Sequence, residues 1–287
     1  MSDLVLQVRD LVVEYPGTPH PFRAVDGVSF DVPRGQTVAI VGESGCGKST
    51  IARSIVRLLT PKSGSVILDG DDIAFMSAKQ LRPLRRKVQM VFQDPYASLD
   101  PHLNAEDIVG EPLRLQGKSR NEQRAQAAKL LDQVGLPVSA LKRKPTEFSG
   151  GQRQRIGIAR ALASSPDLLV CDEATSALDV SVQAQVLRLL AEIQQETGLT
   201  YLVISHNLGV VREISSHTVV MSKGQIVEQG PTEKILSAPS EPYTRSLRAA
   251  ALDPANMVGR KPRHVVSNLA TARNKSEEMK ETSHAIL

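Results

Sequence analysis

A glycine-rich stretch near the start of the chain has the residue types and spacing to bind phosphate. Residues 42–49 read Gly-Glu-Ser-Gly-Cys-Gly-Lys-Ser, which fits the phosphate-loop pattern G-x-x-x-x-G-K-[ST]. Glycines let backbone N–H groups turn inward around phosphate oxygens, because no Cβ stands in the way. Lys48 adds a mobile positive charge for the β- and γ-phosphates, and Ser49 offers a hydroxyl to Mg²⁺. The stretch therefore predicts a site for a nucleoside triphosphate and magnesium.

The surroundings of this loop favour the phosphate site over a chance glycine turn. An apolar strand, residues 37–41, precedes it, and a helix, residues 48–59, follows and points its positive N-terminal end at the same oxygens. Cys46 stands at a free position, where a small residue that fits is a better interpretation than a reactive thiol. The residues expected to contact the nucleotide here are Gly42, Glu43, Ser44, Gly45, Cys46, Gly47, Lys48, Ser49 and Thr50.

A second candidate site is a pair of acids after an apolar run. Residues 168–171 read Leu-Leu-Val-Cys and deliver Asp172 and Glu173 at their C-terminal end, the end that faces the ligand in an open parallel sheet. Asp172 is expected to hold Mg²⁺, and Glu173 to orient and polarise an attacking water. Alone, such a pair is as often an ordinary strand end. Together with the phosphate loop it indicates triphosphate hydrolysis.

Strand and helix patterns alternate along most of the chain, which predicts an α/β fold with a parallel sheet covered by helices on both faces. Between the alternating stretches, residues 93–164 are expected to be mostly helical, with capping-box spacing at Ser119 and Glu122. After about residue 251 the periodicity fades, so residues 1–250 are expected to form the domain and residues 251–287 a disordered tail. The expected strands are residues 4–15, 28–32, 37–41, 65–68, 167–171, 200–204, 217–221 and 225–228.

Composition limits the kind of protein and its compartment. The formal net charge of +4 is too small to argue for a nucleic-acid partner. The two cysteines, Cys46 and Cys171, lie in the apparent nucleotide motifs, which favours a reducing compartment. We see no signal peptide and no apolar run near the ~18 residues that a transmembrane helix needs. A role at a membrane would therefore require docking onto chains that span it.

Further motifs identify the type of phosphate-loop protein. Residues 149–155, Ser-Gly-Gly-Gln-Arg-Gln-Arg, resemble the signature sequence of ABC-transporter ATPases. Gln93 resembles their Q-loop glutamine, residues 176–179 (Ser-Ala-Leu-Asp) their D-loop, and His206 their switch histidine. The order and spacing match from residue 4 to about residue 250. Phe148 departs from the leucine that usually precedes the signature, but it keeps an apolar anchor.

The resemblance implies a P-loop NTPase fold: a RecA-like parallel sheet core, an antiparallel β subdomain and an inserted α-helical subdomain. It implies ATP and Mg²⁺ as the ligands of a hydrolysing enzyme. The implied catalytic residues are Glu173, His206, Lys48 and Gln93. The implied metal ligands are Ser49, Gln93 and Asp172. The implied further nucleotide contacts are Gln93, Asp172, Ser149, Gly150, Gly151, Gln152, Asp179 and Tyr15.

Three of these residues also have ordinary structural interpretations. Ser149 begins a helix expected over residues 152–162 and can bind phosphate at its N-terminus or simply cap it; in the family, the two anion sites around one ATP come from different subunits. His206 is either a solvated residue or, at the same sheet edge as Asp172, a γ-phosphate contact. Tyr15 either stacks on adenine or packs at the edge of the core.

Two stretches are more specific. Residues 93–101 and 238–245 resemble oligopeptide, dipeptide and nickel import ATPases, most closely the second ATPase subunit of the dipeptide system. This resemblance implies a peripheral subunit at the cytoplasmic face of the inner or plasma membrane. The implied partners are two transmembrane permeases, a second ATPase subunit, for which a paralogue is favoured over an identical copy, and an extracytoplasmic solute-binding protein. Residues 93–107 are expected to dock onto the permeases, because they follow Gln93 directly.

Three different functions stay open beside peptide import. The cargo could be nickel, glutathione or another small solute. The chain could also be a soluble ABC ATPase that acts outside transport, or a nucleotide-binding regulator without turnover. The intact Glu173 argues against the regulator, because the expected base for hydrolysis is present.

Overall fold

The computed structural model describes residues 3–17, 20–94, 96–176 and 178–252. The chain divides into two compact units, Met1–Ala249 and Ala250–Leu287. The predicted disordered tail, residues 251–287, lies almost wholly outside the described residues. Everything that follows concerns the first unit.

An antiparallel sheet is formed mainly by the N-terminal part of the chain. Its four strands lie in the order β2-β1-β4-β5. Apolar residues alternate with polar ones in β1, so that Leu6 and Val8 are fully buried while their neighbour Gln7 is half-buried. The strands are β1 (Leu4–Tyr15), β2 (Phe22–Pro33), β4 (Ser63–Leu68) and β5 (Asp71–Asp72).

A second sheet positions the candidate site residues. Its six strands lie in the order β10-β9-β3-β8-β7-β6. Its neighbouring pairs from β9 to β6 are parallel, and only β10 runs antiparallel, on β9. The carboxyl ends of the parallel strands therefore meet at one edge. The strands are β3 (Thr37–Val41), β6 (Val88–Val91), β7 (Leu168–Asp172), β8 (Thr200–Ile204), β9 (His217–Ser222) and β10 (Gln225–Pro231).

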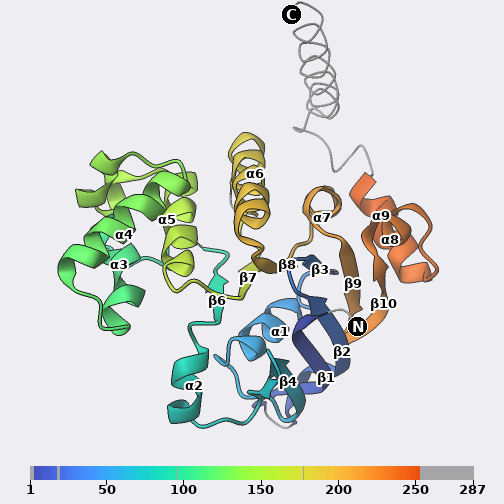
Figure 1. Cartoon of the computed structure of the whole chain (residues 1–287). Coiled ribbons are helices and arrows are strands. Elements are labelled where there is room, and N and C mark those ends of the chain that lie inside the picture. The colour runs from blue at the N-terminus through green and yellow to red at the C-terminus, as the bar shows by residue number, and fades with distance from the viewer. Residues whose placement is uncertain (1–2, 18–19, 95, 177, 253–287) are drawn as a thin grey trace, which may run out of the picture. The chain divides into compact units, whose positions relative to one another are not determined.

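Both faces of the parallel sheet are buried, because successive side chains of a strand point to opposite faces. In β7, Leu168 and Val170 join a core cluster with the antiparallel sheet and helix α1 (Lys48–Ile55), whereas Leu169 and Cys171 join another with the central helices. Ala39 of β3 belongs to a third cluster with the C-terminal helices. The sheet is thus the middle layer of an α/β domain, which confirms the predicted fold class (Figure 1).

The inserted helices follow the capping signals of the sequence. Ser119 and Glu122 form the predicted capping box at the start of α4. Helix α1 is shorter than predicted: it ends at Ile55, because Arg57 takes a left-handed backbone conformation (φ 56°) that closes the last turn. The other helices are α2 (Ala78–Leu84), α3 (Ala105–Leu115), α4 (Arg120–Gln133), α5 (Gly150–Leu162), α6 (Val180–Thr197), α7 (Leu208–Ile214), α8 (Thr232–Ser237) and α9 (Pro242–Leu252), with 3₁₀ turns η1 (Val138–Lys142) and η2 (Pro145–Glu147).

Candidate nucleotide site

The phosphate loop links the end of β3 to the start of α1, as the sequence predicts. Gly42 and Gly47 adopt positive φ values of 152° and 107°. A Cβ on Gly42 would lie 2.2 Å from the carbonyl oxygen of Met221, and one on Gly47 would lie 2.4 Å from that of Ala24. Both positions therefore require glycine for conformation and for space. The loop is held tightly against β9 and β2.

Lys48 is buried within the loop that it serves, with 4% of its surface exposed. Its Nζ donates to the carbonyl oxygens of Gly42 at 2.9 Å and Glu43 at 2.8 Å. Cys46, also buried, places its Sγ 3.8 Å from the same ammonium. A desolvated cation beside the N-terminus of α1 is a strong anchor for phosphate oxygens.

Ser49 and Asp172 meet although 123 positions separate them in the sequence, and the Ser49 hydroxyl donates to Asp172 Oδ1 at 2.8 Å. Asp172 is 3% exposed, and this burial raises the pKa of its carboxyl, while the Ser49 hydrogen bond opposes the rise. A buried carboxylate next to a hydroxyl is a hard-oxygen pair that fits Mg²⁺. Within the described ranges, no group of three or more His, Cys, Asp or Glu residues is arranged to hold a metal ion.

Glu173 is held between two of the other predicted catalytic side chains. Gln93 Nε2 donates to Glu173 Oε2 at 2.9 Å, and His206 Nδ1 lies 3.2 Å from Oε1. The backbone of Glu173 is left-handed (φ 47°), a conformation that is costly for a residue with a Cβ. Its N–H donates to the carbonyl of Ile204 at 3.0 Å. The residues after β6, β7 and β8 thus converge on one carboxylate.

A cleft of about 230 Å³ is lined by residues of the phosphate loop, by Gln93 and Glu173, and by two aromatic residues, Tyr15 and Phe22. Tyr15 hydrogen-bonds Thr50 Oγ1 through its hydroxyl at 3.2 Å. Phe22, the second aromatic, is 62% exposed. Phe22 was not predicted from the sequence, because its place beside Tyr15 depends on the pairing of β1 with β2. Either ring offers a face to a purine base.

The signature residues and Asp179 are not part of the lining of this cleft within the described chain. Ser149 caps α5 in a capping box with Gln152, and Asp179 caps α6 by accepting from the N–H of Val182 at 2.9 Å. Gly151, in the first turn of α5, packs closely against α6, since a Cβ there would be 2.3 Å from Val182 Cγ1; Gly150 follows the cap directly. One chain therefore brings together the loop, the magnesium pair and the Glu173 cluster, and leaves the signature at another place.

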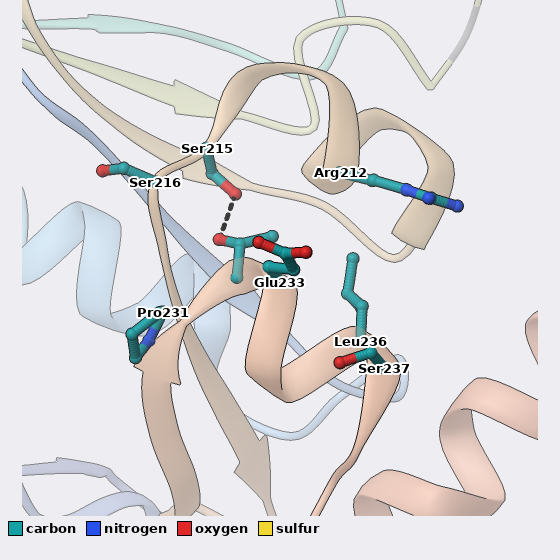
Figure 2. A pocket seen from close by; sticks show the side chains of 8 residues that line it. Arg212, Ser215, Ser216, Pro231, Glu233, Leu236 and Ser237 are labelled. Atoms are coloured by element: carbon teal, nitrogen blue, oxygen red, sulfur yellow. Dashed lines mark hydrogen bonds between the residues drawn. The ribbon is translucent and has the colours of Figure 1, made fainter.

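A larger cavity, of about 570 Å³, lies away from this chemistry, between the end of α7 and helix α8 (Figure 2). None of the predicted site residues lines it. Ser215 and Thr232 in its wall hydrogen-bond each other at 2.9 Å, so these two hydroxyls join α8 to the end of α7. Volume alone does not mark the functional site of this protein.

Comparisons with known proteins show the family of this chain. The family model for ABC transporters matches residues 25–176. A probable peptide ABC transporter ATP-binding protein of Sinorhizobium fredii is 50% identical over 259 residues, which cover 88% of this chain and 73% of the relative. A putative peptide import ATP-binding protein of Brucella ovis is 47% identical over 87% of this chain and 79% of its own length.

Solved structures show the same fold. The ATP-binding cassette MJ0796, in a dimeric post-hydrolysis state bound to ADP and Pi, superposes with a TM-score of 0.73 at 30% identity, covering 79% of this chain and 98% of the other. CbiO1 of Clostridium perfringens, part of the ABC transporter complex CbiONQ, superposes with a TM-score of 0.73 at 26% identity. The match covers 90% of this chain and 100% of CbiO1.

Replacement of Gly47 by alanine tests the loop geometry. The added Cβ would meet the backbone of Ala24 at 2.4 Å, so the loop must move away from its phosphate-binding path. We expect Gly47→Ala to abolish detectable binding of a fluorescent ATP analogue. Gly27→Ala is the matched control, because Gly27 also has a positive φ (67°) but open space around its Cβ position, and it should cost only about 1–2 kcal/mol of stability. Equal binding by both variants would refute the assigned loop geometry.

Proposed function

This chain belongs to the ABC transporter family as an ATP-hydrolysing subunit, and from that premise we propose that it powers the import of di- or oligopeptides. The structural observation that carries the enzymatic half of the proposal is the convergence of Gln93 and His206 on Glu173 beside the phosphate loop. The transport half is supported by the names of its relatives, which are peptide ABC transporter and peptide import ATP-binding proteins.

The geometry divides the work of hydrolysis among a few groups. Lys48 and the loop N–H groups bind the β- and γ-phosphates. Ser49 and Asp172, with Gln93 as a further ligand, would hold Mg²⁺, which neutralises phosphate charge when bound. Glu173 accepts a proton from the water that attacks the γ-phosphorus, and ADP leaves as the bond to the γ-phosphoryl group breaks. His206 fixes the carboxylate and contacts the γ-phosphate.

The second half of each ATP site is proposed to come from a neighbouring ATPase subunit. In this chain Ser149, Gly150, Gly151 and Gln152 begin α5, and the N-terminus of a helix is a ready anion site. These residues lie outside the cleft of their own chain, which supports a role on the nucleotide of another. Asp179 caps the neighbouring α6 and would lie at the same interface.

The partners follow from transport. Within the described part of the chain, no helix is long and apolar enough to cross a membrane. We propose that the chain docks peripherally, at the cytoplasmic face, onto two permeases through residues near 93–107, which continue directly from Gln93. A paralogous second ATPase subunit and an extracytoplasmic solute-binding protein complete the complex, and no nucleic acid takes part. Import of nickel, glutathione or another small solute is the alternative, because the proposed contacts of this chain are with ATP and the permeases and do not identify the cargo.

Glu173→Gln tests the hydrolytic assignment. The amide keeps the shape of the side chain but cannot take the proton, so ATP turnover should fall roughly 10²–10⁴-fold while ATP binding persists. Glu192→Gln, an exposed site on α6, is the matched control and should hydrolyse ATP at the normal rate. Unchanged turnover of Glu173→Gln would remove Glu173 from its role as the base.

Isolation of the chain from its native membrane tests the transport assignment. We expect two permeases and a second ATPase to co-purify with it, and peptide-loaded binding protein to stimulate ATP hydrolysis by the complex. Stimulation by nickel-loaded binding protein alone would replace the peptide proposal with the metal one. A chain that hydrolyses ATP but is recovered with no permease would contradict a role in transport.

A further inference from the structure

The C-terminal segment that marks the importer branch reaches the phosphate loop. Tyr243, near the start of α9, places its hydroxyl 3.2 Å from the backbone nitrogen of Glu43 and accepts a hydrogen bond from it. These residues are 200 positions apart in sequence. Nothing in the chemistry of hydrolysis uses α9, so this contact needs its own explanation.

The contact is made to one particular peptide unit. The N–H of Glu43 and the carbonyl of Gly42 belong to the same planar peptide, and in a trans peptide these two groups point in opposite directions. The Gly42 carbonyl accepts from Lys48 Nζ at 2.9 Å. Tyr243 and Lys48 therefore bind opposite edges of one peptide. The tyrosine bond limits rotation of this peptide, and so fixes the direction of the Gly42 carbonyl that accepts from Lys48.

Tyr243 packs against β3, the strand that leads into the phosphate loop. Its ring and Leu247 pack against a buried cluster that contains Ala39 and Val41 of β3. Val41 is the residue directly before the loop. Tyr243 is partly buried, and the packing of its ring against this cluster restricts the positions that its hydroxyl can take.

The start of α9 is fixed by polar contacts as well. The Glu228 carboxylate on β10 accepts from the N–H groups of Ser240, at 2.7 Å, and Glu241, at 3.3 Å. Arg245 Nη1 donates to the carbonyl of Ser240 at 2.8 Å, and Arg248 Nη1 donates to that of Ser237 at 2.6 Å. Both arginines lie on α9 and bind carbonyls at the end of α8 or just after it.

Helix α8 is anchored in turn to the parallel sheet. Thr232 Oγ1 is within hydrogen-bond distance of two hydroxyls, Thr218 on β9 at 2.8 Å and Ser215 after α7 at 2.9 Å; Figure 2 shows the second of these bonds. Hydrogen bonds therefore join β9 to α8, the end of α8 to α9, and β10 to the residues just before Tyr243. The bond between Tyr243 and the loop extends from this fixed helix.

We propose that Tyr243 is a positioning residue for the phosphate loop, and that the segment 238–245 exists in this chain to present it. Tyr243 holds the peptide between Gly42 and Glu43 in the orientation that sets the place of Lys48. The proposal rests on ATP binding by the loop but not on the transported solute or on the identity of the partners.

Tyr243→Phe is the direct test, because it deletes only the hydroxyl and keeps the packed ring. Glu43 is exposed, so water can satisfy its freed N–H and the melting temperature without nucleotide should stay unchanged. The affinity of the full chain for ATP should fall about fivefold, the ratio that corresponds to the net contribution of one hydrogen bond. Wild-type affinity in this variant would overturn the proposal.

Tyr201→Phe is the matched control. Tyr201 is 2% exposed and donates to the carbonyl of Leu190 at 3.0 Å, away from the loop. Loss of that buried hydrogen bond should lower the melting temperature and leave ATP affinity unchanged. A common fall in ATP affinity in both tyrosine variants would show a general loss of stability instead of positioning. If the wild-type chain itself failed to bind ATP in this assay, the result would contradict the proposed function.

A double-mutant cycle tests whether α9 acts through this hydroxyl. Arg245→Ala releases the first turn of α9 from Ser240 and should weaken ATP binding by up to about fivefold, the limit set by the tyrosine hydrogen bond. In the Tyr243→Phe background the same change should have no further effect on ATP affinity, because the route is already broken. Multiplicative losses in the double variant would refute transmission through Tyr243.

Discussion

The register of the parallel strands is the constraint on which the rest of this structure depends. β3 pairs with β8, β8 with β7, and β7 with β6, all in the same direction. The phosphate loop, His206, Glu173 and Gln93 each follow directly or closely on one of these strands. Strand pairing therefore brings residues from distant parts of the chain to the same carboxyl edge of the sheet, so that short side-chain distances are enough to connect them. A shift of register by one residue would move each side chain of a strand to the opposite face of the sheet, misplace the packing on both faces and disperse the site.

This edge combines a strained backbone with strong local restraint. The left-handed conformation of Glu173 is unfavourable in itself, yet three contacts fix the residue: the carbonyl of Ile204 on its N–H, and Gln93 and His206 on its carboxylate. Asp172, one position earlier, is more deeply buried and accepts a hydrogen bond from Ser49. The two adjacent acids thus have different partners, which supports the separate roles proposed for them.

Sequence alone was sufficient where a local pattern dictates the chemistry. The phosphate loop, the acid pair and the resemblance to ABC ATPases follow from short motifs, and the fold class follows from alternating strand and helix patterns. It was insufficient for Phe22 and for the contact of Tyr243 with Glu43, because these depend on strand pairing and helix packing between distant segments. The predicted end of α1 lies beyond its actual end, because arginine has no preference for the left-handed conformation that Arg57 adopts.

Ser149 offers the most direct test of the shared ATP site, because in this chain it caps its own helix outside the cleft. The decisive measurement is a structure of the assembled transporter, trapped with ATP and Mg²⁺ by the Glu173→Gln substitution. We predict that Ser149 of this chain lies within hydrogen-bond distance of the γ-phosphate bound by the neighbouring ATPase subunit. Contact of Ser149 with the ATP held by Lys48 of the same polypeptide would contradict a site shared between subunits.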